Sequence, residues 1–517
     1  MSALSQTLRS TAVRGQRLLE PVWRRVRARA TVDTRALAAL RIALGVTLLG
    51  DLLHRAQYLE QFYTDSGVYP LSAAEVTYTQ YNGLSVHALS GSLWVQQLLF
   101  VVAGLLAVAL ILGYRTRLVG LLSLLFLFSL HGRNPAVLNG GDRLLRVLLL
   151  VSLVVPLGER WSVDALRRGS ARQTVTSFGT AAVLVQPVAV LTVNAILKHE
   201  GENWYAGDGI EIALRNDTMS ILLGNVLVEY PALLTLLNYG WVTLLAGSPV
   251  FLLLTVGRLR ALAVFAYLGA FAGMALTMAV GVFPFVLAAS VLPFLTTPFW
   301  DTLARRVPAG WRDRLPTADQ LGPVGQPPVE HRLFETARHT GYGSVAGATV
   351  TYARSLLTVL GLVTLLWIVA FSALDVTDYE SPVGFTEHLD QQEWGLYAPD
   401  PSESYSWYIT AAELSNGSIV DVLDGGQVTY DRPPDAAAEY DSFRHRKYLQ
   451  AVRRSGSGQT GAIAAQYHDW ACDRATAAYG SSVETVTLYQ MYQPSPLGGS
   501  YDEEPTRTSV VRDGCVG

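Results

Sequence analysis

Long apolar runs, separated by short polar or arginine-rich segments, dominate the first 375 residues. A helix needs about 20 apolar residues to cross the hydrocarbon core of a bilayer, and most of these runs approach that length. The runs at 118–131 and 143–157 are shorter, so tilted, buried or re-entrant helices are alternatives to full crossings there. The pattern predicts about nine membrane spans, at 35–53, 93–113, 118–131, 143–157, 176–197, 231–255, 261–282, 284–299 and 351–373.

Arginines between the runs predict how the chain is oriented. Basic clusters lie at 1–32, 115–117, 167–172, 258–260 and 305–314. With nine spans and a cytoplasmic N-terminus, every cluster falls on the cytoplasmic side, as the positive-inside rule requires. We therefore expect a multi-pass protein of the cell membrane. Its predicted parts are a basic cytoplasmic segment (1–32), a membrane domain of about eight spans (33–300), a cytoplasmic linker (301–350), a ninth span (351–373) and an extracytoplasmic domain (376–517).

The segment 376–517 has the composition of a separate folded domain. Acidic residues outnumber basic ones, and strand-like stretches predict strands near 406–410, 418–422 and 483–489. Helices are expected near 438–454 and 461–478, which gives a mixed β/α domain. Both cysteines of the chain, Cys472 and Cys515, lie in this segment. An oxidising exterior favours a disulfide between them, and two free thiols are the alternative.

Overall composition agrees with a membrane protein. Half of the residues are hydrophobic, only 16% are charged, and mean hydropathy is +0.27. The lipid bilayer is the expected partner. Because no basic stripe with interleaved aromatic residues occurs, nucleic acid is not an expected partner.

One lysine stands out because the chain has only two lysines among 39 basic residues. Lys198 closes an apolar run, whereas arginine holds almost every other basic position. A lysine can lose its proton when it is desolvated and then act as a base, which arginine cannot do. The alternative is a lysine that extends to the lipid headgroups.

Several polar residues converge on the outer membrane surface in this topology. Polar groups are costly near the bilayer and commonly have a function there. The group comprises Arg55, Asp65, Arg133, Asn134, Asn139, Asp142, Lys198 and Trp204. The sequence predicts a site at the boundary of membrane and exterior, with structural ion pairs or headgroup contacts as the alternative.

These segments resemble a known family. The chain is similar to the HTTM family, whose membrane region is shared with vitamin K-dependent gamma-glutamyl carboxylase, over about residues 33–510. The motifs that carry the resemblance are Leu40-Arg41, Arg55, Tyr63-Thr64-Asp65-Ser66-Gly67-Val68, Arg133-Asn134-Pro135-Ala136-Val137-Leu138-Asn139-Gly140-Gly141-Asp142, Lys198 with Trp204 and Gly207, Gly281-Val282-Phe283-Pro284, Phe299-Trp300 and Trp394-Gly395-Leu396-Tyr397-Ala398-Pro399-Asp400-Pro401.

The resemblance implies a function and a role for each site residue. Lys198 would be the catalytic base that takes a proton from reduced vitamin K or a menaquinol-like quinol. The other residues of the polar group would bind this cofactor, and no metal is implied. With oxygen and carbon dioxide as co-substrates, the reaction would carboxylate glutamate in an exported peptide.

A second function class stays open. Pro135 and Phe271 stand near positions where members of the family have histidine. A non-catalytic or accessory member would bind a quinone or lipid, or assist the maturation of an exported polypeptide. The sequence does not choose between an enzyme and such a protein.

Overall fold

The fold was analysed on a computed structural model. It describes residues 20–21, 23–215, 218–306, 343–374, 395–433, 439–455, 461–495 and 503–515, together with a few isolated positions. Most of the predicted N-terminal segment 1–32 and of the predicted linker 301–350 lies outside the described residues.

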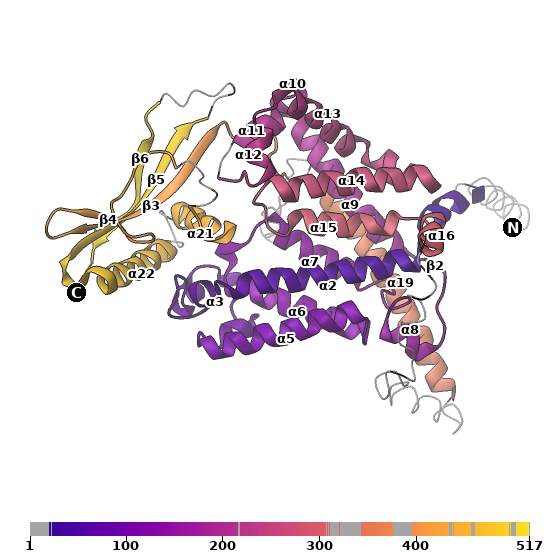
Figure 1. The fold of residues 1–517 in the computed structure, drawn as a ribbon. Helices are drawn as coiled ribbons and strands as arrows, with labels where there is room; N and C mark the ends of the chain where they lie inside the picture. Colours follow the sequence, from indigo (N-terminus) through magenta and orange to yellow (C-terminus); the bar gives the residue numbers. More distant parts are fainter. Residues whose placement is uncertain are drawn as a thin grey trace, which may run out of the picture.

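The first three hundred residues form a helical bundle, in which α2, α5, α14 and α15 run side by side (Figure 1). Its main helices are α2 (Thr34–Ala56), α5 (Leu93–Leu112), α6 (Thr116–Arg133), α7 (Gly140–Ser152), α9 (Phe178–His199), α13 (Pro231–Ser248), α14 (Gly257–Thr277), α15 (Phe283–Val291) and α16 (Thr297–Arg306). Helix α19 (Gly343–Leu374) packs along α9.

Short elements connect the long helices. The helices among them are α3 (Leu59–Tyr63), α4 (Leu71–Val76), α8 (Val163–Arg168), α10 (Asn203–Ala206), α11 (Gly209–Arg215) and α12 (Leu223–Leu227). A π-helical turn, η4 (Pro249–Leu254), continues α13, and the two-stranded pair β1 (Thr31–Asp33) and β2 (Thr174–Thr176) joins the starts of α2 and α9.

Six described helices are long and apolar enough to cross a membrane, or up to seven if a sharply bent pair forms one span. They are α2, α5, α9, α13 with η4, α14 and the part of α19 from Thr351; the bent pair is 283–294 with α16. The two short predicted runs form α6 and α7, and α7, with 13 residues, is shorter than a usual crossing. The count of nine spans and their orientation therefore stay predictions.

Polar caps fix where the helices that build the candidate site begin. Asn139 and Asp142 form a capping box at the start of α7, and Ser177 and Thr180 form one at the start of α9. Each cap satisfies backbone N–H groups that the first helical turn leaves without partners. Inside the bundle, leucine and valine side chains of α2, α7, α9 and α15 form one continuous core.

The C-terminal region folds as a four-stranded antiparallel sheet with strand order β4-β3-β5-β6. The strands are β3 (Ser404–Leu414), β4 (Ile419–Asp421), β5 (Val483–Pro494) and β6 (Thr506–Gly514). Helix α22 (Gly461–Tyr479) packs on the sheet, and α21 (Phe443–Arg454) packs on α22. The predicted strands and helices are found at these places, whereas β6 was not predicted.

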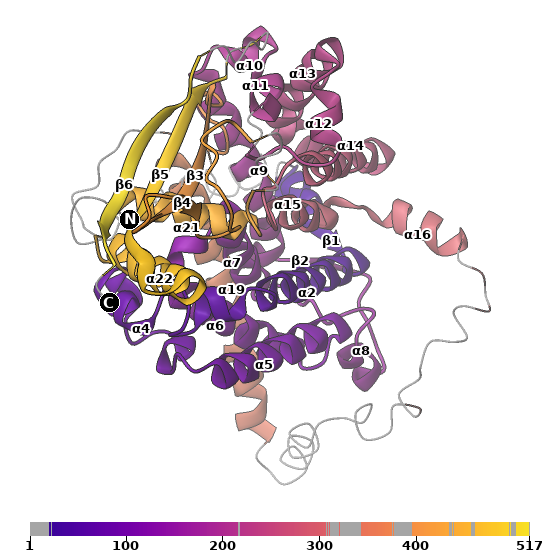
Figure 2. The same cartoon turned by 60° about the vertical axis from the view of Figure 1, so that its left-hand side comes forward.

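Helix α21 lies between the sheet and one end of the bundle (Figure 2). The Tyr448 hydroxyl donates a hydrogen bond to the Val68 carbonyl at 2.6 Å, and the Arg446 guanidinium donates to the Thr218 carbonyl at 2.7 Å. A shared apolar cluster includes Phe62 and Tyr63 of the bundle and Leu449 of α21. The C-terminal region is therefore docked on the bundle through α21.

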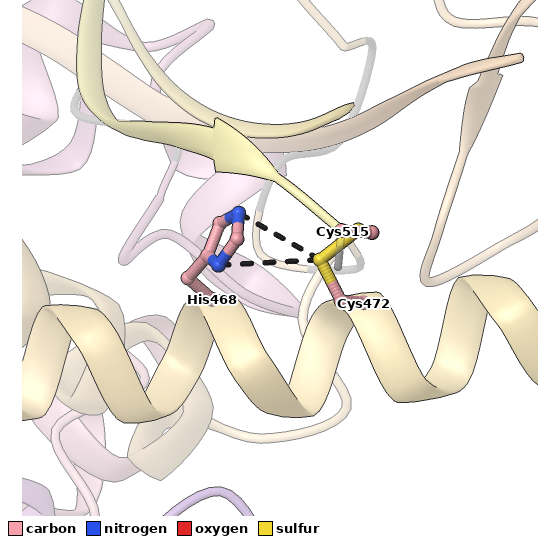
Figure 3. A group of neighbouring side chains, drawn as sticks. All are labelled: His468, Cys472 and Cys515. Carbon is pink, nitrogen blue, oxygen red and sulfur yellow. Dashed lines mark hydrogen bonds between the residues drawn. A yellow bond between two sulfur atoms is a disulfide. The ribbon is translucent and has the colours of Figure 1, made fainter. Parts of the chain in front are cut away.

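Cys472 and Cys515 lie together, with their Cα atoms 5.5 Å apart and their sulfur atoms at bonding distance (Figure 3). The pair joins α22 to the end of β6. The imidazole of His468 lies one turn before Cys472, and its Nε2 is 3.7 Å from the Cys472 sulfur. This geometry suits the predicted disulfide.

Candidate functional site

Lys198 lies near the end of α9 with only 3% of its surface exposed. Its Nζ donates hydrogen bonds to the backbone carbonyls of Leu396 at 2.7 Å and Tyr397 at 2.8 Å. The same atom lies 3.7 Å from the ring centre of Trp204, in position for a cation–π interaction. All acceptors of this amine are thus neutral.

The segment that supplies the two carbonyls is fixed to the start of α10. Trp204 Nε1 donates to the Tyr397 carbonyl at 2.9 Å. The Asp400 carboxylate accepts from the backbone N–H groups of Glu202 at 2.9 Å and Asn203 at 3.0 Å. These bonds close residues 395–400 over the end of α9.

Tyr397 has an unusual backbone conformation that turns its carbonyl toward Lys198 and Trp204. Its φ is +54°, a left-handed value that is uncommon for a residue other than glycine. The Tyr397 hydroxyl donates to the Met219 sulfur at 2.6 Å. Burial raises the pKa of Tyr397, so this hydroxyl stays neutral. Backbone strain at a precise contact is a common feature of functional sites.

A cavity of about 800 Å³ lies beside the lysine. Its walls come from α9, α11, α13, α14, α15 and the segment 396–397, and they are mostly aliphatic or aromatic. Ligand sites are commonly apolar cavities of this size with a few polar groups that fix orientation. Polar groups at the wall are Asn194, Lys198, Trp204, Tyr239, Trp241, Thr243, Thr277 and Tyr397.

Within the described part of the chain, no carboxylate lies at ion-pair distance from Lys198. Glu200 and Glu202 follow it closely in sequence, but both are exposed, and the contacts of Nζ are with Leu396, Tyr397 and Trp204. A buried amine without an anion, at one end of an apolar cavity, can bind an acidic hydroxyl and take its proton.

A second buried polar group lies where α2, α7 and α21 meet. We call Asp51, Arg55, Asp142 and Arg444 the ion cluster. Arg55 donates to Asp51 at 2.7 Å and to Asp142 at 2.6 Å, while Arg444 donates to Asp51 at 2.6 Å and to Asp142 at 3.0 Å. Two positive and two negative charges balance within it.

A family model, the HTTM domain, matches residues 29–300, which is more than half of the chain. The chain belongs to the HTTM family. This is the family that includes vitamin K-dependent carboxylase. No curated protein and no solved structure matches the chain.

The predicted site residues of this HTTM protein fall into separate groups. Lys198 and Trp204 lie together at the cavity. Arg55 and Asp142 belong to the ion cluster, and Asn139 caps α7 beside Asp142. The structure thus places Lys198 with Trp204 at the cavity and Arg55, Asn139 and Asp142 together at the ion cluster.

The remaining predicted residues lie in the loops near α3 and α6. Arg133 donates to the Tyr69 carbonyl at 2.9 Å and lies 3.9 Å from Asp65. Asn134 donates to the Phe62 carbonyl at 2.9 Å. None of these three residues lines the HTTM cavity.

Phe283, a residue of the cavity wall, connects the cavity with the ion cluster. Phe283 lines the cavity, and its backbone packs so closely on Gly141 that an added Cβ would lie 2.6 Å from the Phe283 nitrogen. Asn139 also donates to the Val280 carbonyl at 2.9 Å. The start of α7 therefore supports the cavity wall while Asp142 of the same turn belongs to the ion cluster.

Sequence reasoning missed the roles of Leu396, Tyr397 and Arg444. The first two lie within the motif at 394–401, so the motif was a usable signal for a contact with Lys198. Arg444 lies in the basic run Arg444-His445-Arg446-Lys447, and the sequence gives no sign that its partners are Asp51 and Asp142 on α2 and α7.

Two groups of three metal-ligating side chains occur among the described residues. In the first, His468, Cys472 and Cys515, the sulfur atoms are bonded to each other. In the second, Asp51, His131 and Asp142, two arginines already occupy the carboxylates. Because these sulfur atoms and carboxylates already have partners, neither group favours a metal.

Proposed function

We propose that this HTTM protein binds a reduced quinone in the cavity, with one hydroxyl of the quinol at Lys198 Nζ. The single observation that carries the proposal is a buried amine at the end of a large apolar cavity, with no carboxylate of the described residues within ion-pair distance. The apolar walls suit a fused aromatic ring. The amine provides the polar end that orients it.

In the proposed reaction, Lys198 Nζ accepts the proton of the quinol hydroxyl. When bound, the reduced quinone would supply the chemistry: its reaction with oxygen would generate a stronger base. The positive charge that forms on Nζ is stabilised by the carbonyls of Leu396 and Tyr397 and by the Trp204 ring. Exclusion of water from the cavity strengthens each of these interactions.

The finer proposal is a gamma-carboxylase-like activity with oxygen and carbon dioxide as co-substrates. Glutamate in an exported peptide would be the group that is carboxylated. The family supports it, since the HTTM family includes vitamin K-dependent carboxylase. This proposal also requires the predicted extracytoplasmic position of the C-terminal domain.

The decisive experiment replaces Lys198 in the full chain, reconstituted in lipid nanodiscs. Oxygen-dependent conversion of a menaquinol to its epoxide is followed by chromatography. We expect Lys198→Ala to reduce turnover by about 10²–10⁴-fold, the usual contribution of a positioned base. Lys447→Ala is the matched control because it removes the other lysine, which lies on α21, and should retain turnover. Unchanged turnover in Lys198→Ala would overturn the proposed role.

One observation favours the accessory class as a second candidate. Nζ already has two carbonyl acceptors and lies over an indole ring, the surroundings of a stable ammonium ion. A protein that only binds a quinone or lipid would need no further contacts at Nζ. In that case the wild-type protein would bind the quinone but produce no epoxide and no carboxyglutamate.

A further inference from the structure

Two arginines meet at the end of the bundle that lies opposite the C-terminal sheet (Figure 1). Arg29 ends the helical stretch 23–29, drawn in indigo near the N label, and Arg260 lies near the start of α14. Arg29 Nη1 donates to the carbonyls of Leu253 at 3.1 Å and Thr255 at 2.9 Å, and also to that of Leu254. Arg260 donates to the same carbonyls of Leu253 at 3.1 Å and Thr255 at 2.9 Å. We call Arg29 and Arg260 the arginine pair.

The carbonyls at the end of η4 compensate only part of the charge of the arginine pair. The C-terminal end of a helix carries about half of an elementary negative charge, whereas each guanidinium carries a full positive charge. Within the described residues, every hydrogen bond of both guanidiniums goes to one of these neutral carbonyls. Arg260 is also buried, which strengthens the repulsion between the two cations. The arrangement therefore favours an anion beside the pair.

Free donors and apolar neighbours describe the ligand that would suit this place. Nη1 of Arg260, and Nε and Nη2 of Arg29, have no hydrogen-bond partner in the part of the chain that the structure describes. Around the pair, Leu254 is 62% exposed and Leu259 is 66% exposed. Since α14 is apolar enough to span a membrane, these leucines would contact lipid chains. The arginine pair would then lie at the boundary of hydrocarbon and water, where lipid phosphates lie.

The helical stretch 23–29 has the composition of a helix that lies in the membrane interface. Trp23 is exposed, and so are Arg24, Arg25 and Arg27. Basic helices with large apolar side chains lie among the headgroups and attract anionic lipids, and tryptophan is enriched at that depth. Because Arg29 fixes the stretch to the end of η4, the basic residues stay at this end of the bundle.

We propose that the arginine pair binds the phosphodiester of one anionic glycerophospholipid, with phosphatidylglycerol as the probe. Its free phosphate oxygens would accept from the unpaired N–H groups of Arg29 and Arg260, and its acyl chains would lie along Leu254 and Leu259. A zwitterionic lipid suits the site less well because its ammonium group adds another positive charge. In the predicted topology this leaflet is the cytoplasmic one. Neither arginine lines the cavity beside Lys198, so this lipid site is separate from the proposed quinone site.

The test titrates the full chain in detergent with phosphatidylglycerol, and with phosphatidylcholine of the same acyl chains, and counts bound lipid by native mass spectrometry. We expect the wild type to bind phosphatidylglycerol roughly tenfold more tightly, as a charge-assisted contact provides. Arg29→Gln should remove most of this preference, and Arg29→Lys, which keeps the charge, should retain it. Arg27→Gln is the matched control, because it removes an exposed arginine of the same stretch and should change the affinity less than twofold.

Thermal unfolding separates lipid binding from folding. Phosphatidylglycerol should raise the melting temperature of the wild type but not that of Arg29→Gln. Equal affinity of the wild type for the two lipids, or equal losses in Arg27→Gln and Arg29→Gln, would overturn the site, because general attraction to a basic surface would then explain binding. Displacement of the lipid by inorganic phosphate would assign the pair to a free anion and overturn the lipid assignment. If Arg29→Gln fails to fold, the comparison of the two lipids and the phosphate competition on the wild type still decide.

Discussion

Among the buried cations that the structure describes in this HTTM protein, those of the ion cluster and Lys198 differ in how their charge is compensated. In the ion cluster, Arg55 and Arg444 face Asp51 and Asp142, so each cation has two anions. At the cavity, Lys198 has two carbonyls and an indole ring, and no carboxylate among the described residues lies within ion-pair distance of it, although Asp400 acts on it from farther away. One centre is electrically complete and the other is not.

The surroundings of the ion cluster and of Lys198 also differ. The ion cluster joins α2, α7 and α21, whereas Lys198 borders a cavity of about 800 Å³. A fully paired arginine cannot change its protonation state and serves to hold elements together. A lysine without an anion beside a cavity can bind or exchange a proton with a ligand. The comparison separates a structural centre from a functional one.

The largest effect should come from exchanging the type of cation at the cavity. Lys198→Arg retains a positive charge but cannot give it up. We expect quinol turnover to fall by about 10²–10⁴-fold, as far as in Lys198→Ala, while the protein stays folded. Stopped-flow or steady-state epoxidation measures this effect. Activity of Lys198→Arg near the wild-type level would show that charge alone matters at this position. It would contradict the distinction between the ion cluster and Lys198.

The next effect concerns the ion cluster. Arg444→Ala leaves two buried carboxylates facing one arginine, a loss that typically costs about 3–5 kcal/mol. We expect a lower free energy of unfolding and undocking of α21, with faster hydrogen exchange in 443–454. Arg453→Ala is the control, since Arg453 on the same helix is exposed and forms an exposed hydrogen bond to Gln490. Equal stability of the two variants would contradict a structural role for the cluster.

Much of this architecture was predictable because its signals are local. Apolar runs locate α2, α5, α9 and α14, and alternation locates β3 and β5, since both patterns depend on residues near in sequence. Strand β6 was missed because Thr506–Gly514 is mostly exposed and polar, as edge strands commonly are. Its place follows from pairing with β5, which the sequence of β6 alone does not encode.

The candidate site was predicted only in part for a related reason. Lys198 was identified by its rarity, and Trp204 by its motif, and the two are neighbours. The eight-residue polar group was expected at one surface, but Asp142, which pairs with Arg55, has a second partner in Arg444, about 300 residues away in the chain. Such a contact depends on how α21 docks, so local patterns do not reveal it.

A smaller effect is expected from the cysteine pair, which is distant from both centres. Cys472→Ser opens a link between residues 43 positions apart, for which about 2–4 kcal/mol is typical. We expect the C-terminal sheet to unfold at lower temperature while quinol binding at the cavity is kept. Differential scanning calorimetry, together with quenching of tryptophan fluorescence by the bound quinone, measures both, since Trp204 and Trp241 line the cavity. A reducing agent should lower the wild-type melting temperature to that of the variant, and no response to it would contradict the disulfide.

The smallest effect, a pH dependence, tests docking at the ion cluster without changing its charges. His445 follows Arg444, is buried, and has no hydrogen-bond partner for either ring nitrogen among the described residues. Burial lowers the pKa of His445 from 6.5 to about 4, with Asp441 opposing the shift and Arg474 adding to it. Between these values the unfolded chain carries a proton that the folded chain lacks, so acid favours unfolding.

Stability should therefore be fully retained above pH 6.5 and decline by about 3 kcal/mol as the pH falls toward 4. His445→Phe should remove this slope, since the ring already packs against the rings of Phe62 and Tyr440. Chemical unfolding in detergent at several pH values measures it. A slope that persists in His445→Phe would assign the acid sensitivity to other groups. If the slope disappears, α21 docks through a neutral imidazole beside a fully charged cluster, and its docking then depends on pH in a way that Arg55 and Arg444 alone cannot provide.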